Sequence, residues 1–159
     1  MNFVITSLSA GRGVIGICPA PGRYGDFAAD LDTLLAWQPA LVLSVTELAE
    51  LDRIGAESFP DKLAHAGIEW AYLPIRDFGA PEGKTLAHWP ETSQQVRATL
   101  DKGGRVLVHC FGGCGRSGMA ILRLLVEMGE NGAEALNRLR VVRPCAVETE
   151  AQMQWALHL

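Results

Sequence analysis

Hydrophobic and polar positions along the first two thirds of the chain follow two periods, one typical of strands and one typical of helices. Four short apolar runs, bounded by Gly, Pro or polar residues, predict strands over 14–18, 40–45, 69–75 and 105–110. Between them, residues 26–37 predict a helix because apolar side chains recur at helical spacing, at Phe27, Leu31, Leu34 and Leu35. Residues 90–102 end in a Gly-Gly pair suited to a helix stop, so they predict a second helix.

After residue 110 the pattern is helical throughout. It predicts one helix from about Arg116 to Met128, a second from about Gly132 to Val142, and a last one that begins near Thr149. Strands alternating with helices favour an α/β fold, with a central, mostly parallel sheet of about five strands flanked by helices and a C-terminal helical cluster. The chain has 159 residues and no internal repeat or low-complexity linker, which predicts a single domain over residues 1–159.

Composition narrows the possible partners and the compartment. A formal net charge of -4 leaves no basic surplus for a nucleic-acid backbone, and no block of Lys or Arg suggests an anionic membrane surface. No apolar run approaches the roughly 18 to 20 residues that span a bilayer, and the first residues lack the features of a secretory signal. We therefore expect a soluble, cytoplasmic protein that binds no nucleic acid and does not span a membrane. No pattern in the sequence specifies an oligomeric state.

Four cysteines are present, and their spacing is not that of a disulfide framework. In a cytoplasmic compartment we expect Cys18, Cys110, Cys114 and Cys145 to be reduced. Individual cysteines are then candidates for reactivity.

One segment combines a cysteine with an anion-binding loop. Residues 109–118, with the sequence HCFGGCGRSG, leave the last predicted strand and enter a helix through a loop that contains three glycines. Glycines allow successive amide N–H groups to turn inward, and the positive end of the following helix adds to them, so this loop suits a phosphate group. In a parallel sheet, binding sites also lie beyond the carboxyl ends of the strands, which is where this loop lies.

The side chains of this loop suit nucleophilic chemistry on that phosphate. Arg116 can hold two phosphate oxygens with its planar guanidinium group, and the loop amides favour the thiolate form of Cys110. The Ser117 hydroxyl can donate to the sulfur. A Gly-rich turn with a buried cysteine is also ordinary α/β architecture. His109, Cys110, five spacer residues, Arg116 and Ser117 together favour the catalytic interpretation.

This segment resembles the signature of the cysteine-dependent protein tyrosine phosphatase superfamily, which is His-Cys, five residues, Arg, then Ser or Thr. The chain is most similar to the compact dual-specificity phosphatases, and especially to the branch that includes the kinase-associated phosphatase. Three further segments carry the resemblance, which are 73–81 (LPIRDFGAP), 140–144 (RVVRP) and 148–152 (ETEAQ). The resemblance implies a phosphatase-like fold, a phosphocysteine intermediate, a phosphorylated protein or peptide as substrate, and neither a cofactor nor a metal.

The resemblance also implies roles for individual residues. Cys110 is the nucleophile, and Arg116 binds the substrate phosphate together with the loop residues Phe111, Gly112, Gly113, Cys114 and Gly115. Asp77 protonates the leaving oxygen, a step that typically contributes about 100-fold to 10,000-fold. Asp77 is alternatively a turn residue that caps its own loop, in which case Glu82 replaces it.

Other positions keep two interpretations each. By resemblance, Gln152 positions the water that hydrolyses the intermediate, but Gln152 also completes a capping box that begins at Thr149. By resemblance, His109 points inward and supports the loop backbone. Arg143 either supports the loop or is the basic end of a helix.

Cys114 departs from the family pattern. It could trap an oxidised Cys110 as a disulfide, although a loop wrapped around an anion points its intervening side chains outward, which disfavours that bridge. A zinc site at His109, Cys110 and Cys114 is excluded because no second pair of ligands is present.

Two other function classes remain as alternatives. One is a rhodanese-like sulfurtransferase, which also places a cysteine and an arginine on a loop after a strand. The other is an inactive, phosphate-binding module. The spacer between Cys110 and Arg116 has no lysine, whereas the inositol-lipid branch of the resembled family tends to have basic residues there, so the resemblance favours a phosphoprotein over an inositol lipid as substrate. The preference for phosphotyrosine or phosphoserine and phosphothreonine stays open.

Overall fold

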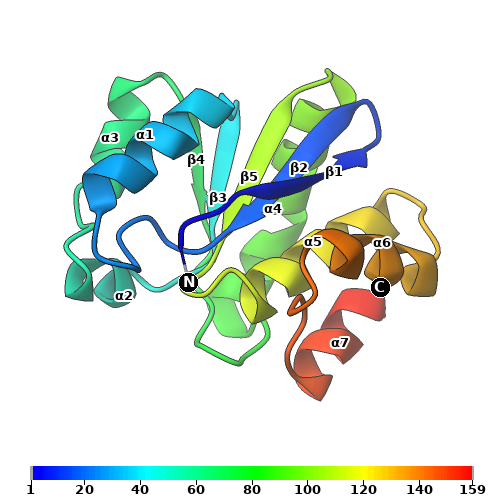
Figure 1. Ribbon diagram of the computed structural model, residues 1–159. Helices are drawn as coiled ribbons and strands as arrows, with labels where there is room; N and C mark the ends of the chain where they lie inside the picture. Colours follow the sequence, from blue (N-terminus) through cyan, green and yellow to red (C-terminus); the bar gives the residue numbers. More distant parts are fainter. Residues whose placement is uncertain (1, 159) are drawn as a thin grey trace.

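A computed structural model describes residues 2–158 of the chain, which form a five-stranded sheet with helices on both faces (Figure 1). The strand order is β1-β2-β5-β3-β4. The strands are β1 (Thr6–Ala10), β2 (Gly13–Cys18), β3 (Leu41–Ser44), β4 (Glu69–Tyr72) and β5 (Arg105–His109). β1 and β2 form an antiparallel hairpin, and the remaining strand pairs are parallel. The α/β fold with a mostly parallel sheet of about five strands is therefore confirmed.

Seven helices surround the sheet within the described part of the chain. They are α1 (Phe27–Trp37), α2 (Leu48–Arg53), α3 (Phe59–His65), α4 (Gly83–Asp101), α5 (Gly115–Glu127), α6 (Gly132–Val142) and α7 (Glu150–Leu157). α1 and α3 lie together on one side of the sheet, and α5, α6 and α7 are grouped on the other, as Figure 1 shows. This last group is the C-terminal helical cluster that the sequence predicts.

The two faces of the sheet bury separate hydrophobic cores. The smaller core packs Val42 and Leu107 against α1, α2 and α3. The larger core packs Val106 and Val108 against α4 and the C-terminal cluster. These two residues neighbour Leu107 on the central strand β5 but lie on its opposite face. Successive side chains of a strand point to opposite faces, so a strand covered on both sides is apolar at every position. This explains why the central strand is a continuous apolar run.

The elements that differ from the predictions are short or irregular. β1, α2 and α3, which are five to seven residues long, have no counterpart among the predicted elements. α4 begins at Gly83 rather than at Pro90, which lies inside the helix. Pro90 removes only one backbone hydrogen bond, whereas Trp89 is buried and donates to Glu127 Oε2 at 2.7 Å. The packing of the first turns of α4 therefore stabilises the helix by more than the lost hydrogen bond at Pro90 destabilises it.

The carboxyl ends of β2, β3 and β5 meet at one edge of the sheet, which faces downward in Figure 1. His109 at the end of β5 is paired with Cys18 on one side and with Ser44 on the other. The segment that follows each strand therefore converges on the segment that follows β5.

No helix among residues 2–158 is long and apolar enough to cross a membrane.

Candidate active site

The loop that joins β5 to α5, residues 110–116, turns its carbonyl groups outward. The Phe111 carbonyl accepts from the Ala20 amide at 3.0 Å, and the Cys114 carbonyl accepts from the amides of Gly118 and Val147 at 2.9 and 3.3 Å. Between them, the carbonyls of Gly112 and Gly113 accept from Arg143 at 3.0 and 2.7 Å. Four consecutive carbonyl groups are thus held on the outside of this loop.

The amide groups of the same peptides face the inside of the loop. In a planar trans peptide, the C=O of one residue and the N–H of the next point in opposite directions, and no peptide bond of the described chain is cis. The amide of Gly113 shows the result, because it donates to Cys110 Sγ at 3.2 Å. Successive inward amides form a concavity that suits an anion.

Gly113 fits this loop for two physical reasons. Its φ of 72° lies in the left-handed region that disfavours other residues. A Cβ atom at this position would also lie only 2.6 Å from the carbonyl carbon of Cys18 and from the nitrogen of Pro19. The loop therefore packs directly on the backbone that follows β2.

The Cys110 sulfur lies at the bottom of this concavity. Cys110 is 2% exposed and is a free cysteine, and its Sγ lies 3.2 Å from Ser117 Oγ. Ser117 is on the first turn of α5, so the helix presents its N-terminal end toward the sulfur. The positive end of a helix and an amide donor both favour negative charge at this point.

His109 supports the loop from below as a neutral side chain. It is fully buried, and its Nδ1 lies 3.1 Å from the Cys110 carbonyl oxygen. A carbonyl only accepts, so Nδ1 carries the proton and Nε2 accepts from the hydroxyl of Ser44. That hydroxyl oxygen accepts in turn from Trp70 Nε1 at 2.8 Å. Burial lowers the pKa of His109 to about 4, with a smaller contribution from Arg116, so His109 is uncharged at neutral pH.

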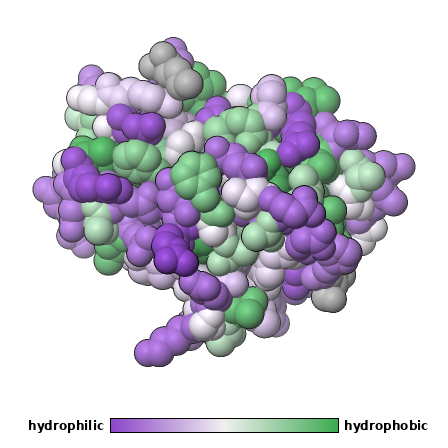
Figure 2. Space-filling view, turned by 90° about the horizontal axis from the view of Figure 1, so that it is seen from below, coloured by the Kyte–Doolittle hydropathy of each residue, from purple (hydrophilic) through white to green (hydrophobic). Residues whose placement is uncertain are grey.

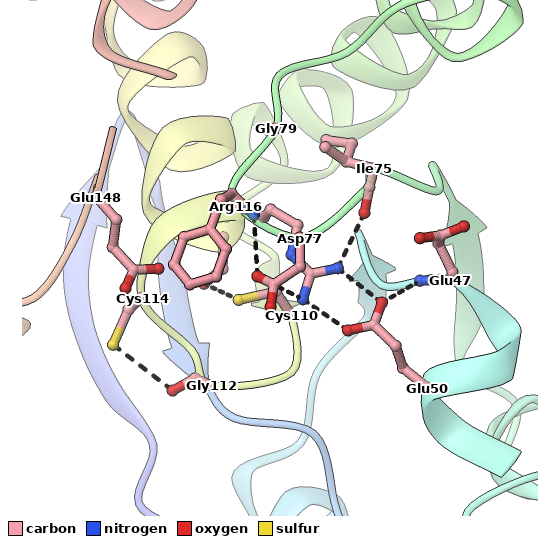
Figure 3. Close-up of polar contacts among 12 residues, drawn as sticks. Glu47, Glu50, Ile75, Asp77, Gly79, Cys110, Gly112, Cys114, Arg116 and Glu148 are labelled. Atoms are coloured by element: carbon pink, nitrogen blue, oxygen red, sulfur yellow. Dashed lines mark hydrogen bonds and ion pairs between the residues drawn. The ribbon is translucent and has the colours of Figure 1, made fainter. Parts of the chain in front are cut away.

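Arg116 is held in the site by a buried carboxylate, that of Glu50 on α2 (Figure 3). Its Nη1 and Nη2 donate to the two oxygens of Glu50 at 2.7 and 2.8 Å, and Nη1 also donates to the Ile75 carbonyl at 2.9 Å. The Arg116 side chain is 1% exposed, and its Nε is buried without a partner among the described residues. An unused, buried N–H beside the loop is a donor available to a bound anion.

Glu50 is a residue that the sequence interpretation missed. Although burial by itself disfavours its charged form, hydrogen bonds from Arg116 and from the Glu47 amide hold the pKa of Glu50 below its usual value. The sequence carries a weak signal for this role, because Glu47 and Glu50 form a capping box at the start of α2. The short helix itself was not predicted, so the signal was not recognised.

Asp77 lies on the loop after β4 and faces Arg116 and Cys110. Its Oδ1 is 3.3 Å from Arg116 Nη2 and accepts from the Phe78 amide at 3.0 Å. Asp77 therefore caps its own turn and also lines the site, so the two interpretations are compatible. Glu82, the alternative acid, is the N-cap residue of α4 and forms an exposed ion pair with Arg76 at 3.7 Å. Glu82 is not among the residues that line the site.

Gln152 lies behind the site rather than in it. Its side chain is fully buried, and its Oε1 accepts from the amides of Glu148 and Thr149 at 2.9 and 3.2 Å. Its Nε2 donates to the Gly79 carbonyl at 3.1 Å. These contacts are those of the capping-box interpretation, and Gln152 is not among the residues that line the site, so its placement of a catalytic water stays a prediction. Gln152 instead ties the loop that carries Asp77 to the start of α7.

Glu148 lines the site where Gln152 was expected. Its carboxylate lies against Gly115, where a Cβ atom would approach Glu148 Oε1 to 2.3 Å and Gln152 Oε1 to 2.9 Å. A larger residue at the start of α5 would therefore displace the ends of these two side chains. Figure 3 shows Glu148 reaching toward the loop from the side opposite Glu50. Sequence reasoning missed Glu148 because its exposed position in the irregular segment before α7 gives no signal by itself.

These groups surround one hollow of about 170 Å³. Its lining residues are Arg23, Asp77, Phe78, Cys110, Phe111, Gly112, Cys114 and Glu148. The Arg23 guanidinium stacks on the Phe111 ring at 4.3 Å, which places a cation at the rim. Figure 2, a view from below, shows hydrophobic side chains interspersed with hydrophilic ones on this side of the molecule. The hollow is large enough for a phosphate group with an aromatic or aliphatic group at its mouth.

Cys114 is joined to Cys145 by a disulfide, with their Cα atoms 5.1 Å apart. The prediction that all four cysteines are reduced is therefore wrong for this pair. Cys110 is free, so the structure shows no bridge between Cys114 and Cys110, in line with the expectation that the loop geometry disfavours one. Cys110 and Cys18 are free, and burial, followed by the nearby Cys110, strongly raises the pKa of Cys18. The two bonded cysteines are 31 positions apart in the chain, which explains why spacing gave no signal.

The comparisons with known proteins agree with this geometry. Residues 41–158 match the family model described as dual specificity phosphatase, catalytic domain. The chain belongs to this family. It is thus a cysteine-dependent phosphatase of the protein tyrosine phosphatase superfamily, as the sequence resemblance implied. The interpretation as a rhodanese-like sulfurtransferase is overturned by the same match.

Relatives of this dual-specificity phosphatase domain match from about half to most of its length. It is 26% identical to cyclin-dependent kinase inhibitor 3 of Sus scrofa over 149 residues, which is 89% of this chain and 69% of the relative. It is 32% identical over 78 residues to protein phosphatase Slingshot homolog 3 of Homo sapiens, which is 48% of this chain and 12% of the relative.

Solved structures agree with the fold of the phosphatase domain. Kinase associated phosphatase, with its catalytic-site cysteine substituted by serine, superposes with a TM-score of 0.86 at 23% identity, covering 98% of this chain and 93% of that one. Tk-PTP in its active form gives 0.71 at 30% identity, covering 94% and 92%. The chain accordingly functions as a protein phosphatase.

Proposed function

We propose that residues 1–159 form one catalytic domain that hydrolyses phosphorylated proteins or peptides through a phosphocysteine on Cys110. The observation that carries this proposal is the position of Cys110 Sγ, which contacts both the Gly113 amide and Ser117 Oγ at 3.2 Å. The sulfur faces the same hollow as Asp77, and Arg116 lies beside it. Nucleophile, acid and phosphate-binding groups thus converge from three separate segments.

In the first step, the Cys110 thiolate attacks phosphorus and the bond from phosphorus to the substrate oxygen breaks. Asp77 donates its proton to that oxygen, which leaves as an alcohol or a phenol. The inward amides of residues 112–115 and the free Nε of Arg116 stabilise the charge on the transferring phosphoryl oxygens. Glu50 fixes the orientation of the guanidinium group, so little reorganisation is needed during the reaction.

In the second step, a water molecule attacks the phosphocysteine and Cys110 leaves as a thiolate. Asp77, now ionised, accepts the proton of this water. The Ser117 hydroxyl donates a hydrogen bond to the departing sulfur, which lowers the free energy of the thiolate. We assign the placement of the water to Glu148, since its carboxylate lines the hollow whereas Gln152 is buried behind it.

The substrate proposal rests on the lining of the hollow. The spacer from Phe111 to Gly115 contains no lysine, so the loop has no side-chain cation of its own for a polyphosphorylated lipid headgroup. The aromatic rings of Phe78 and Phe111 flank the mouth, which suits the side chain of a phosphorylated residue. We place the enzyme in the cytoplasm, because its nucleophile must be maintained as a free thiol.

Hydrolysis of para-nitrophenyl phosphate by the purified protein tests the proposal. Wild-type protein is expected to turn over this substrate, and Cys110→Ser is expected to bind inorganic phosphate without turnover. Measurable turnover by purified Cys110→Ser would refute the nucleophile assignment. Absence of turnover in wild-type protein would instead support the inactive, phosphate-binding alternative.

A phosphopeptide panel identifies the substrate class. Asp77→Ala is expected to retain phosphopeptides, since the leaving oxygen is no longer protonated while Cys110 and Arg116 remain in place. Retention of phosphotyrosine peptides alone would indicate tyrosine specificity, and retention of all three phosphoresidues would indicate dual specificity. Hydrolysis of inositol phospholipids in preference to every phosphopeptide would contradict a protein substrate.

A further inference from the structure

The Cys114–Cys145 disulfide connects the loop that binds phosphate to a segment outside the catalytic machinery. Cys114 lies within the 110–116 loop, and Cys145 lies on the turn between α6 and α7. Neither sulfur is the nucleophile, and the mechanism proposed above does not use either. The cross-link therefore needs a role of its own.

The cross-link is the covalent part of a larger contact between these two segments. Arg143 donates to the carbonyls of Gly112 and Gly113, and the Val147 amide donates to the Cys114 carbonyl. Each of these bonds holds a carbonyl outward and so keeps the following amide directed into the site. Residues 143–147, which we call the supporting segment, thus determine the shape of the anion-binding loop from its outer side.

The disulfide is accessible, whereas the other two cysteines are not. Cys145 is exposed and Cys114 is half-buried, but Cys18 and Cys110 are buried. Both bonded cysteines line a second hollow, of about 390 Å³, together with Arg23, Tyr24, Gly112 and Arg143. A small thiol can therefore reach Cys145 Sγ from solvent.

The surroundings also favour departure of Cys114 as a thiolate. Cys114 is the N-cap residue of α5, a helix of 13 residues, and the positive end of a helix lowers the energy of a thiolate. Arg23 and Arg143 add positive charge around the same hollow. A sulfur that leaves readily as a thiolate makes a disulfide easier to open.

We propose that Cys114–Cys145 is a thiol-exchange site whose substrate is a dithiol reductant and whose state controls phosphate binding by the loop. One thiolate of the dithiol attacks Cys145 Sγ, the bond between the two protein sulfurs breaks, and Cys114 leaves as a thiolate that then takes a proton. The second thiol of the reductant displaces Cys145, which gives two protein thiols and a cyclic disulfide of the reductant. Two electrons pass from the dithiol to the protein.

The disulfide form binds phosphate more tightly because the cross-link preorganises the loop. In the dithiol form, the noncovalent contacts of Arg143 and Val147 remain, so the loop loses only part of its support. We expect opening of the disulfide to weaken phosphate binding at least about fivefold without unfolding the protein. This inference rests on the proposed function, since it assumes that the loop binds phosphate.

Calorimetric titration of inorganic phosphate into the Cys110→Ser protein tests the inference, because this background removes the redox chemistry of the nucleophile. Protein purified without reductant is compared with the same protein treated with dithiothreitol, and peptide mapping verifies the state of each cysteine. We expect weaker binding after treatment and recovery after reoxidation. A matched variant, Cys110→Ser with Cys145→Ser, is expected to bind weakly with or without dithiothreitol.

Cys110→Ser with Cys18→Ala is the control, because Cys114 and Cys145 are then the only cysteines in the chain. Its response to dithiothreitol is expected to equal that of Cys110→Ser. Equal phosphate affinity before and after reduction would overturn the inference, as would mapping that finds Cys114 and Cys145 as thiols in protein purified without reductant. If the disulfide form bound no phosphate at all, the proposed function itself would fail.

Discussion

Glu50 binds both terminal nitrogens of Arg116, at 2.7 and 2.8 Å, although the two residues are 66 positions apart in the chain. Both side chains are buried, and Arg116 keeps only its Nε without a partner among the described residues. The pair therefore orients the guanidinium group and leaves one N–H for a phosphate oxygen. α2 thereby contributes to phosphate binding without contacting the substrate.

Replacing Glu50 is expected to impair both stability and catalysis. Glu50→Ala removes the only buried carboxylate beside Arg116 among the described residues and leaves it the half-exposed Asp77, and breaking a buried ion pair typically costs about 3 to 5 kcal/mol of unfolding free energy. Glu50→Gln retains the shape of the side chain, and we expect its kcat/KM to fall about 100-fold, because the guanidinium group is no longer fixed. Unfolding in urea and steady-state kinetics measure the two effects. Glu57→Gln is the matched control, because Glu57 is an exposed residue between α2 and α3.

Stability is expected to depend on the protonation of His109. Its pKa is lowered from 6.5 to about 4 by burial, so the unfolded chain binds more protons than the folded chain between these two values. The unfolding free energy should therefore decrease as pH falls through this window, by up to about 1.4 kcal/mol per pH unit. Urea unfolding at a series of pH values measures this slope.

The lowered pKa of Glu50 acts in the same direction at more acidic pH, since its contribution is lost as pH falls through its folded-state pKa. His109→Gln removes the titrating imidazole and is expected to flatten the slope between pH 6.5 and about 4. An unchanged slope in this variant would assign the dependence to other groups.

Ser117 is expected to act mainly on the breakdown of the phosphocysteine. Its hydroxyl lies 3.2 Å from Cys110 Sγ, where it stabilises the departing thiolate. A hydrogen bond to a charged group contributes about 1.5 to 3 kcal/mol, so Ser117→Ala should slow this step about 10-fold to 100-fold. Rapid-quench kinetics should then reveal a burst of para-nitrophenol and accumulated phosphoenzyme. Slow substrate cleavage without a burst would place the role of Ser117 in the first step instead.

Asp77→Asn is expected to impair hydrolysis in proportion to the basicity of the leaving group. The carboxyl group supplies a proton to the leaving oxygen, so phenyl phosphate should lose activity more than para-nitrophenyl phosphate does. General acid catalysis of this kind contributes about 100-fold to 10,000-fold. Glu82→Gln is the control, because Glu82 forms an exposed ion pair away from the hollow. Equal losses for the two leaving groups would argue against a proton donor at residue 77.

Glu148 and Gln152 are distinguished by which property each variant changes. Glu148→Ala is expected to slow hydrolysis of the phosphoenzyme while the protein remains as stable as wild type, since this side chain lines the hollow. Gln152→Ala removes a capping box and the bond to Gly79, so it should lower the unfolding free energy by about 1 to 2 kcal/mol. If only Gln152→Ala lost phosphoenzyme hydrolysis, and its unfolding free energy equalled that of wild type, Gln152 rather than Glu148 would position the water.

The sequence by itself determined the features that depend on neighbouring residues. The period of apolar positions predicted four of the five strands and the alternation that gives the parallel sheet. The segment from His109 to Ser117 carries nucleophile, amides and guanidinium group within nine consecutive residues, so its chemistry can be recognised from spacing alone. Asp77 was recognised through the family resemblance of residues 73–81, and its position after a predicted strand agrees with that role.

Only the tertiary structure decided the partners of these residues. Glu50 holds Arg116, Cys145 is bonded to Cys114, and Gln152 supports the loop of Asp77 instead of facing the site. Each contact joins segments that are 31 to 73 residues apart. Backbone periodicity acts over a few residues, whereas these contacts follow from how loops pack at one edge of the sheet, so no local pattern encodes them.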